Sequence, residues 1–234
     1  MRLADKPAES AALVSPALAS TAPAGTALDS DAIFRIAVEG FEAGRDAVLR
    51  ERDDISFEES PAPRRLAPYA AALGAVAYRD GTDDDVEAGS GRLVLLFDPD
   101  GQDGWTGHFR LVAYVRADIE EEMAADPLLG EVGWSWLTDA LELRAPGYTA
   151  PSGTVTRVIT EGFGTKSGEL PVTGFELRAS WSPPEDTDLG VNVEAWCDLL
   201  AAAAGLPAPP PGTSALRPGS PHASPPPPAG RRRR

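Results

Sequence analysis

The amino-acid sequence predicts a single α+β domain, an antiparallel sheet of about six strands with packed helices, between disordered termini. Leu93 to Phe97 is apolar at every position and has the length of a strand, whereas Trp105 to Val115 alternates between apolar and polar residues. Asp98 to Gly104 between them is rich in Pro, Asp and Gly, the residues of turns. These stretches predict a hairpin at the centre of the sheet. An entirely apolar strand must be covered on both faces, so we expect packed elements on each side of Leu93 to Phe97.

The stretch before this hairpin predicts one helix and two strands. Asp29 is a suitable N-cap for a helix that ends at about Arg50. Ile55 to Glu58 alternates as a short strand does. Pro68 to Tyr78 fits the period of a helix as well as that of a strand, and we favour the strand. A short acidic loop, Asp80 to Gly91, then leads into the central hairpin, as in a meander.

The stretch after the hairpin predicts further helices and a second hairpin. Asp126 followed by Pro127 is a strong helix start, and Val132 and Leu143 lie on the apolar stripe of the helix that follows. The predicted elements are an acidic turn of helix at Asp118 to Asp126, a helix from there to about Arg144, strands at Thr154 to Phe163 and Val172 to Trp181 joined by a turn at Gly164 to Gly168, and a helix from Asp188 to about Ala204.

Both ends of the chain lack the pattern of a folded segment. They are rich in Pro, Ala and Ser, so they bury too little apolar surface to offset their ordering entropy. Asp5 and Glu9 break the basic start that a signal peptide needs, and no segment approaches the ~20 apolar residues of a membrane span. We therefore expect a cytoplasmic protein with a disordered leader at 1–28, a domain at 29–205 and a disordered tail at 206–234.

Charge is segregated along the chain. Asp29 to Gly205 holds 34 acidic and 14 basic residues, a net charge of −20, whereas Leu206 to Arg234 holds five arginines and no acid. Phosphate groups are bound by clustered Lys and Arg, so the domain is predicted to repel nucleic acid and anionic membranes. Arg231 to Arg234 could touch RNA or an acidic surface through weak, salt-sensitive contacts, and an intramolecular contact with the acidic body is an equal alternative.

Four short motifs depart from the patterns that carry chemistry. Asp98 to Gly104 lacks the glycine at the sixth place of a calcium loop, and Gly162 to Ser167 has Thr165 where a phosphate loop needs glycine before lysine. Ser135 lacks the second glycine of a nucleophile elbow. Cys197 falls on the apolar side of the last helix, which predicts a core residue and not a reactive thiol. We expect neither a metal nor a cofactor.

His108 is the one histidine outside the tail. Period two sets His108, Arg110 and Tyr114 on the face opposite the core residues of the strand, and such a face can bind an anion or a carboxylate-bearing ligand. The alternative is a half-exposed sheet face without a ligand, or a histidine whose hydrogen bonds are satisfied under a helix. A single histidine excludes a multi-histidine metal site, and a Ser-His-Asp triad would depend wholly on His108.

No constellation of nucleophile, base and orienting group remains, so we favour a non-enzymatic, acidic binding or regulatory module for an unknown protein partner or small ligand. A small-molecule enzyme or ligand sensor that uses His108 is one alternative, and a concave, partly apolar pocket with His108 in its wall would favour it. An RNA-metabolism accessory protein that uses the arginine tail is the other.

Three stretches resemble a known family. They are GRLVLLFDPDGQDGWTGHFRLVAYVR from Gly91, GTVTRVITEGFG from Gly153 and DLGVNVEAWCDLLAAAAGL from Asp188. Over about Ile33 to Pro207 the chain is similar to an actinobacterial family known as a domain of unknown function, number three thousand. The resemblance implies a cytosolic actinobacterial protein. It implies no activity, cofactor or catalytic residue, so no site is carried over from it.

Overall fold

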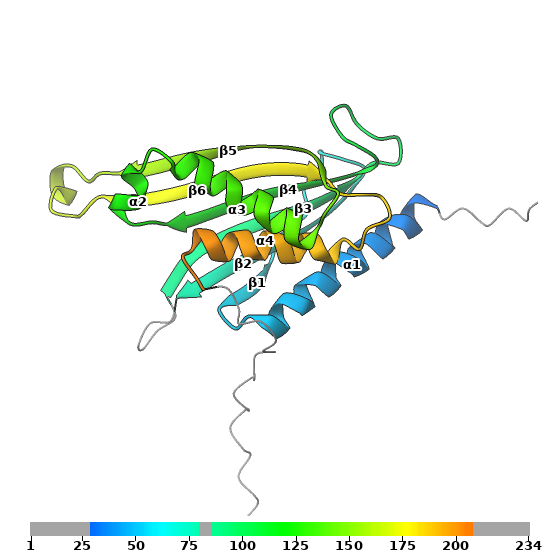
Figure 1. Ribbon diagram of the computed structural model, residues 1–234, viewed down its shortest axis with the longest axis horizontal. Coiled ribbons are helices and arrows are strands. Elements are labelled where there is room, and N and C mark those ends of the chain that lie inside the picture. Colours follow the sequence, from blue (N-terminus) through cyan, green and yellow to red (C-terminus); the bar gives the residue numbers. More distant parts are fainter. Residues whose placement is uncertain (1–28, 80–85, 208–234) are drawn as a thin grey trace, which may run out of the picture.

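The computed structural model describes residues 29–79 and 86–207, which form one sheet with helices on one face (Figure 1). The strands are β1 (Ile55–Glu59), β2 (Tyr69–Arg79), β3 (Val86–Phe97), β4 (Phe109–Asp118), β5 (Thr149–Thr160) and β6 (Val172–Ser182). The helices are α1 (Ser30–Glu51), α2 (Glu121–Ala125), α3 (Leu129–Arg144) and α4 (Gly190–Ala203), with a 3₁₀ turn, η1 (Gly164–Lys166), between β5 and β6. All six strands pair antiparallel in the order β1-β2-β3-β4-β6-β5, which confirms the predicted single α+β domain.

The central position of the β3-β4 hairpin is confirmed, because these are the third and fourth strands of six. Every residue from Leu93 to Phe97 is buried, with exposed fractions between 0 and 7%. Helices cover one face of β3, and the segment 60–68, which joins β1 to β2, lies against the other. Arg92 of β3 donates to the Pro61 carbonyl, and Gln102 donates to the Leu66 carbonyl at 3.0 Å. The expected cover on both faces is therefore confirmed.

Helix α4 lies across the middle of the helical face and supplies much of the core there (Figure 1). Ten of its 14 residues are buried, so it is apolar nearly all round. Trp181 of β6 and Trp196 of α4 are both fully buried, and the Trp181 indole donates to Asn192 Oδ1 at 2.9 Å. Cys197 is 1% exposed and burial raises the pKa of its thiol, which confirms the predicted core position.

Helix α1 crosses α4 at a point where both helices carry glycine. A Cβ atom on Gly44 would overlap the backbone of Gly190, so the two helices approach more closely than larger residues would allow. Glycine lowers the stability of a helix interior by about 1 kcal/mol relative to alanine, and this close packing offsets that loss. Asp29 caps α1 as predicted and accepts from the Ala32 N–H at 2.7 Å.

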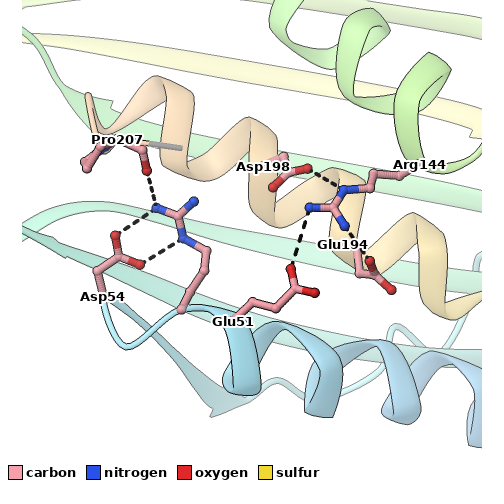
Figure 2. Close-up of polar contacts among 7 residues, drawn as sticks. Glu51, Asp54, Arg144, Glu194, Asp198 and Pro207 are labelled. Atoms are coloured by element: carbon pink, nitrogen blue, oxygen red, sulfur yellow. Dashed lines mark hydrogen bonds and ion pairs between the residues drawn. The ribbon is translucent and has the colours of Figure 1, made fainter. Parts of the chain in front are cut away.

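Arg144, in the last turn of α3, ties three helices together (Figure 2). It donates to Glu194 at 2.8 Å and to Asp198 at 2.9 Å, both on α4, and lies 3.8 Å from Glu51 at the end of α1. Burial raises the pKa of the Glu194 carboxyl. The guanidinium therefore offsets the repulsion of three carboxylates that the fold brings together.

Arg52 connects Asp54 to Pro207, which lie close together on the same side of the domain (Figure 2). Its side chain donates two bonds of 2.8 Å to Asp54 and one of 3.1 Å to the Pro207 carbonyl. Only 6% of Arg52 is exposed. The residue thus anchors the chain beyond α4 to the turn between α1 and β1.

The predicted start and apolar stripe of the helix after Asp126 are wrong in part. Asp126 lies in a turn, where its side chain accepts from the Leu128 N–H at 2.8 Å, and α3 begins at Leu129. Val132 and Leu143, expected on the buried stripe, are 42% and 75% exposed. The buried stripe of α3 is narrower than predicted. A Cβ atom on Gly133 would overlap the Phe175 ring, so α3 packs directly on that ring along a narrow line.

Several strand boundaries also differ from the prediction. Of the loop predicted from Asp80 to Gly91, residues 80–85 lie outside the described residues, and 86–91 belong to β3. Gly91 lies within this strand, where a Cβ atom would press on the Trp196 ring. Strand β4 begins at Phe109, so Trp105 lies in the preceding loop. The ambiguous stretch Pro68 to Tyr78 forms β2, and the preferred strand is confirmed.

The predicted leader at 1–28 lies outside the described residues, as does the predicted tail except for Leu206 and Pro207. Within the described part of the chain, no helix has both the length and the apolar character to cross a membrane.

Candidate functional site

The candidate site lies on the sheet face turned away from α1, α3 and α4, here called the open face. Antiparallel pairing sets its side chains in rows across four strands. Residues directly opposite each other on neighbouring strands are about 5 Å apart, so each row forms a continuous surface. One row is Arg92, Tyr114, Arg178 and Thr154, and the next is Val94, Val112, Ser180 and Ser152.

A cavity of about 760 Å³ lies over these two rows. Pro63 and Leu66 of the segment 60–68 complete its wall. Small-ligand sites commonly span roughly 300–1,000 Å³ and combine an apolar lining with a few polar groups. The cavity has this composition, because Val94 and Val112 form an apolar floor between arginine and serine side chains.

Arg110 lies beside the serine end of the cavity and is 7% exposed. Its Nη2 donates to Ser180 Oγ at 2.7 Å, with longer contacts to Ser182 at 3.3 Å and Ser152 at 3.5 Å. Within residues 29–79 and 86–207 it pairs with no carboxylate, and burial lowers the pKa of its guanidinium.

The two serines that line the cavity are arranged to donate into it. Ser152 and Ser180 have their Oγ atoms 3.4 Å apart, so one hydroxyl can donate to the other. Both oxygens also accept from Arg110. At least one hydroxyl hydrogen is therefore left for a group in the cavity, and the positive charge behind it strengthens that donor.

Arg92 and Arg178 flank Tyr114 in the other row. The Arg178 guanidinium carbon lies 5.0 Å from the centre of the Tyr114 ring, a cation–π distance, and Nη1 is 2.9 Å from Glu176. Arg92 donates to the Pro61 carbonyl, but its Nε is buried without a hydrogen-bond partner. A buried donor of this kind lowers stability unless an acceptor reaches it. Burial raises the pKa of Tyr114, so its phenol stays a neutral donor at neutral pH.

The cavity is basic although the domain is acidic. In the part of the chain that the structure describes, its lining includes Arg92 and Arg178 and no Asp or Glu. Arg64 and Arg65 are exposed in the segment 60–68, which also lacks acids. An anion approaching this side of the molecule is therefore drawn towards the cavity and away from the rest of the surface.

His108 lies apart from this cavity. It precedes β4, its side chain is 46% exposed, and its Nδ1 is 2.6 Å from Oε1 of Glu185 in the loop between β6 and α4. Glu185 helps to line a second cavity of about 550 Å³ beside α1, but His108 lines neither cavity. Of the three residues predicted to share a face, the structure brings Arg110 and Tyr114 together and leaves His108 in the loop, because strand alternation begins at Phe109.

Sequence reasoning missed Arg92, Arg178, Ser152 and Ser180. Alternation within a strand predicts which residues share a face, but residues on different strands come together only through the register of pairing. Arg92 could have been found, because it has the same parity as Val94 in the central strand. The two serines could not, because β5 and β6 carry many small hydroxyl residues.

Comparison with known proteins agrees with the extent of the fold. The family model described as "Protein of unknown function (DUF3000)" matches residues 31–213, which include every strand and nearly the whole of α1. No curated protein and no solved structure was found to match the chain. The family description assigns no activity, so the candidate site rests on its geometry. Because the match covers most of its length, the chain belongs to the DUF3000 family of proteins of unknown function.

Proposed function

We propose that this protein is a non-enzymatic, cytoplasmic binding module whose open-face cavity takes a small amphipathic anion, a carboxylate- or phosphate-bearing molecule with an apolar body. The observation that carries the proposal is Arg110, a guanidinium that is 7% exposed and has serine hydroxyls as its side-chain partners. A buried charge without a counter-charge destabilises a fold. Perturbed charged groups beside cavities also cluster at functional sites, and an anion at the serine pair would supply the missing charge.

Both halves of such a ligand have a counterpart in the cavity. The apolar body would lie on Val94 and Val112 under Leu66. The anionic group would accept from the Ser180 hydroxyl beside Arg110, and the charges of Arg92 and Arg178 in the same lining would attract it. A hydrogen bond that involves a charged group contributes roughly 1.5–3 kcal/mol, so this contact would favour an anion over a neutral analogue.

The lining supports a binding role in preference to a catalytic one. Among residues 29–79 and 86–207, it contains no His, Cys, Asp or Glu, the side chains that most often act as general bases or acids near neutral pH. Tyr114 has a raised pKa, so its phenol is protonated at neutral pH and does not act as a general base. His108, the base of the alternative enzyme hypothesis, is outside this cavity. The proposal therefore gives Tyr114 and the arginines the role of ligand contacts.

Isothermal titration calorimetry and thermal unfolding with four probes test the ligand class. Octanoate and octyl phosphate carry both parts of the proposed ligand, octanol lacks the charge and acetate lacks the apolar chain. We expect at least one of the first two to bind and to raise the free energy of unfolding, by about 2.7 kcal/mol at a hundredfold excess over Kd. The two anionic probes distinguish a carboxylate from a phosphate site. Equal binding of octanol, or no binding of either anionic octyl probe, would refute the proposal.

Two arginine variants locate the binding site. Arg92→Met is expected to weaken binding of the preferred octyl anion about 10-fold, because it removes one of the positive charges that line the cavity. Arg45→Met removes a partly exposed arginine that pairs with Asp46 on α1, and it should leave the affinity unchanged. Similar losses in both variants would mean that general charge attracts the anion and that the open face is not the site.

A further inference from the structure

We infer that two copies of this chain associate through β5, paired antiparallel about a two-fold axis, so that their sheets become continuous. β5 is the outermost strand of the sheet, and among the described strands it pairs only with β6 (Figure 1). Eleven of its 12 residues are exposed. The free side of such an edge carries N–H and C=O groups that are ready to pair with another strand.

The two edges of the sheet differ in how they resist pairing. β1 has five residues and ends in Glu58 and Glu59, a short charged edge of the kind that discourages association. β5 has 12 residues and no acid. Its one charged residue, Arg157, folds back to donate to the Pro127 carbonyl at 3.0 Å and towards the Ala124 carbonyl at 3.5 Å. The charge of Arg157 is therefore held by the loop before α3. Pro151 and a shift in register between Thr149 and Ser152 protect the start of the strand, so the unprotected part of β5 is 152–160.

Charge favours this edge for self-association. Two copies of a domain with a net charge of −20 repel each other, so a contact surface to which neither copy contributes acids is favoured. β5 provides such a surface, because it is composed mainly of Thr, Val and other uncharged residues. A two-fold axis at Thr156 would set Thr154 opposite Val158 of the partner subunit, and residues of this kind form favourable cross-strand pairs.

The exposed apolar residues at the two ends of β5 also complement each other under this symmetry. The β5-β6 hairpin projects from the body at one end, and its Phe163 and Leu170 are 79% and 87% exposed (Figure 1). Leu143, in the last turn of α3 just before the other end of β5, is 75% exposed. Antiparallel pairing brings the hairpin of each copy to the Leu143 end of its partner. The two-fold axis repeats this contact, as expected of an isologous interface.

Sedimentation velocity and light scattering on the full chain test this inference. We expect the wild type at micromolar concentration to have twice the chain mass of 24.5 kDa. The double variant Thr156→Lys and Val158→Lys would bring like charges together across the axis, so it should be monomeric. The matched control is Ser56→Lys with Glu58→Lys, the same spacing on the opposite edge, and it should remain a dimer.

Other outcomes would overturn the inference. A monomeric wild type would mean that β5 stays bare or pairs with a different protein, and a larger assembly would mean that the contact is not a closed two-fold. A β5 variant that remains dimeric, or a β1 variant that dissociates, would move the interface elsewhere. Hydrogen exchange of the wild type adds a measurement that needs no variant. Protection of amides in 152–160 should rise with protein concentration, and constant protection would contradict the pairing.

Discussion

Replacing Arg110 with methionine should raise the free energy of unfolding, although it removes a buried side chain with three polar contacts. Arg110 is 7% exposed, and its best hydrogen bond is the one to Ser180 at 2.7 Å. If Arg110 serves to stabilise the fold, its replacement should lower the free energy of unfolding. If it serves to bind an anion, its replacement should raise the free energy of unfolding.

Two opposing contributions decide whether the Arg110→Met change raises or lowers the free energy of unfolding. Loss of the charged hydrogen bond to Ser180 lowers stability by roughly 1.5–3 kcal/mol. Removal of a buried charge without a counter-charge raises it by several kcal/mol, and methionine still fills much of the volume with apolar atoms. We expect a net gain of about 1–2 kcal/mol. Ser180→Ala should have the opposite effect, a loss of about 1–2 kcal/mol, because it keeps the charge and removes its best acceptor.

Urea unfolding followed by tryptophan fluorescence measures both variants, since Trp181 and Trp196 are fully buried and report on the core. Octanoate titration of the same Arg110→Met sample should show weakened binding. A loss of more than about 1 kcal/mol in Arg110→Met would refute the reasoning, because Arg110 would then stabilise the fold without a ligand.

Three further predictions concern the helices and His108. Gly44→Ala should destabilise the domain by about 2 kcal/mol in thermal or urea unfolding, because the new methyl group overlaps α4, whereas Gly130→Ala, with open space around it, should be neutral or slightly stabilising. Arg144→Met should destabilise by about 2 kcal/mol at neutral pH and by less in acid. Burial raises the folded-state pKa of Glu194, so the contribution of Glu194 to stability is greatest below its unfolded pKa and falls as pH rises through its folded pKa. Removing Arg144 enlarges this loss of stability with rising pH. Urea unfolding between pH 4 and 8 would measure it. His108→Ala should change the free energy of unfolding by less than about 1 kcal/mol and leave octanoate binding unchanged, since its pair with Glu185 is exposed; a larger loss of affinity would return His108 to the site.

Much of the fold follows from short-range patterns. The uninterrupted apolar run from Leu93 to Phe97 correctly predicted a central strand covered on both faces, because no other environment accommodates such a run. The sequence did not predict which segment covers the second face of this strand. The segment 60–68 has no periodicity, and it is held there by long-range hydrogen bonds such as that from Gln102 to Leu66.

Predictions that depend on how elements meet were less successful. Gly44 lowers the helix propensity of the first helix, and propensity takes no account of the close approach to α4 that glycine permits. The stripe on α3 was drawn too wide, because hydrophobicity alone does not show that Leu143 lies beyond the edge of the contact. The candidate site combines residues from four strands through their register, so the sequence predicted Arg110 and Tyr114 but not the serines in the row between them.

The place of α4 also affects how the nascent chain matures. Translation delivers the strands first and α4 after them, at about 5–20 residues per second. Until Trp196 and Leu200 arrive, the apolar side of the sheet has no central cover and is a target for chaperones. A chain truncated before Gly190 therefore keeps an exposed apolar surface that chaperones and proteases can recognise. Docking of α4 completes the domain in a single late step.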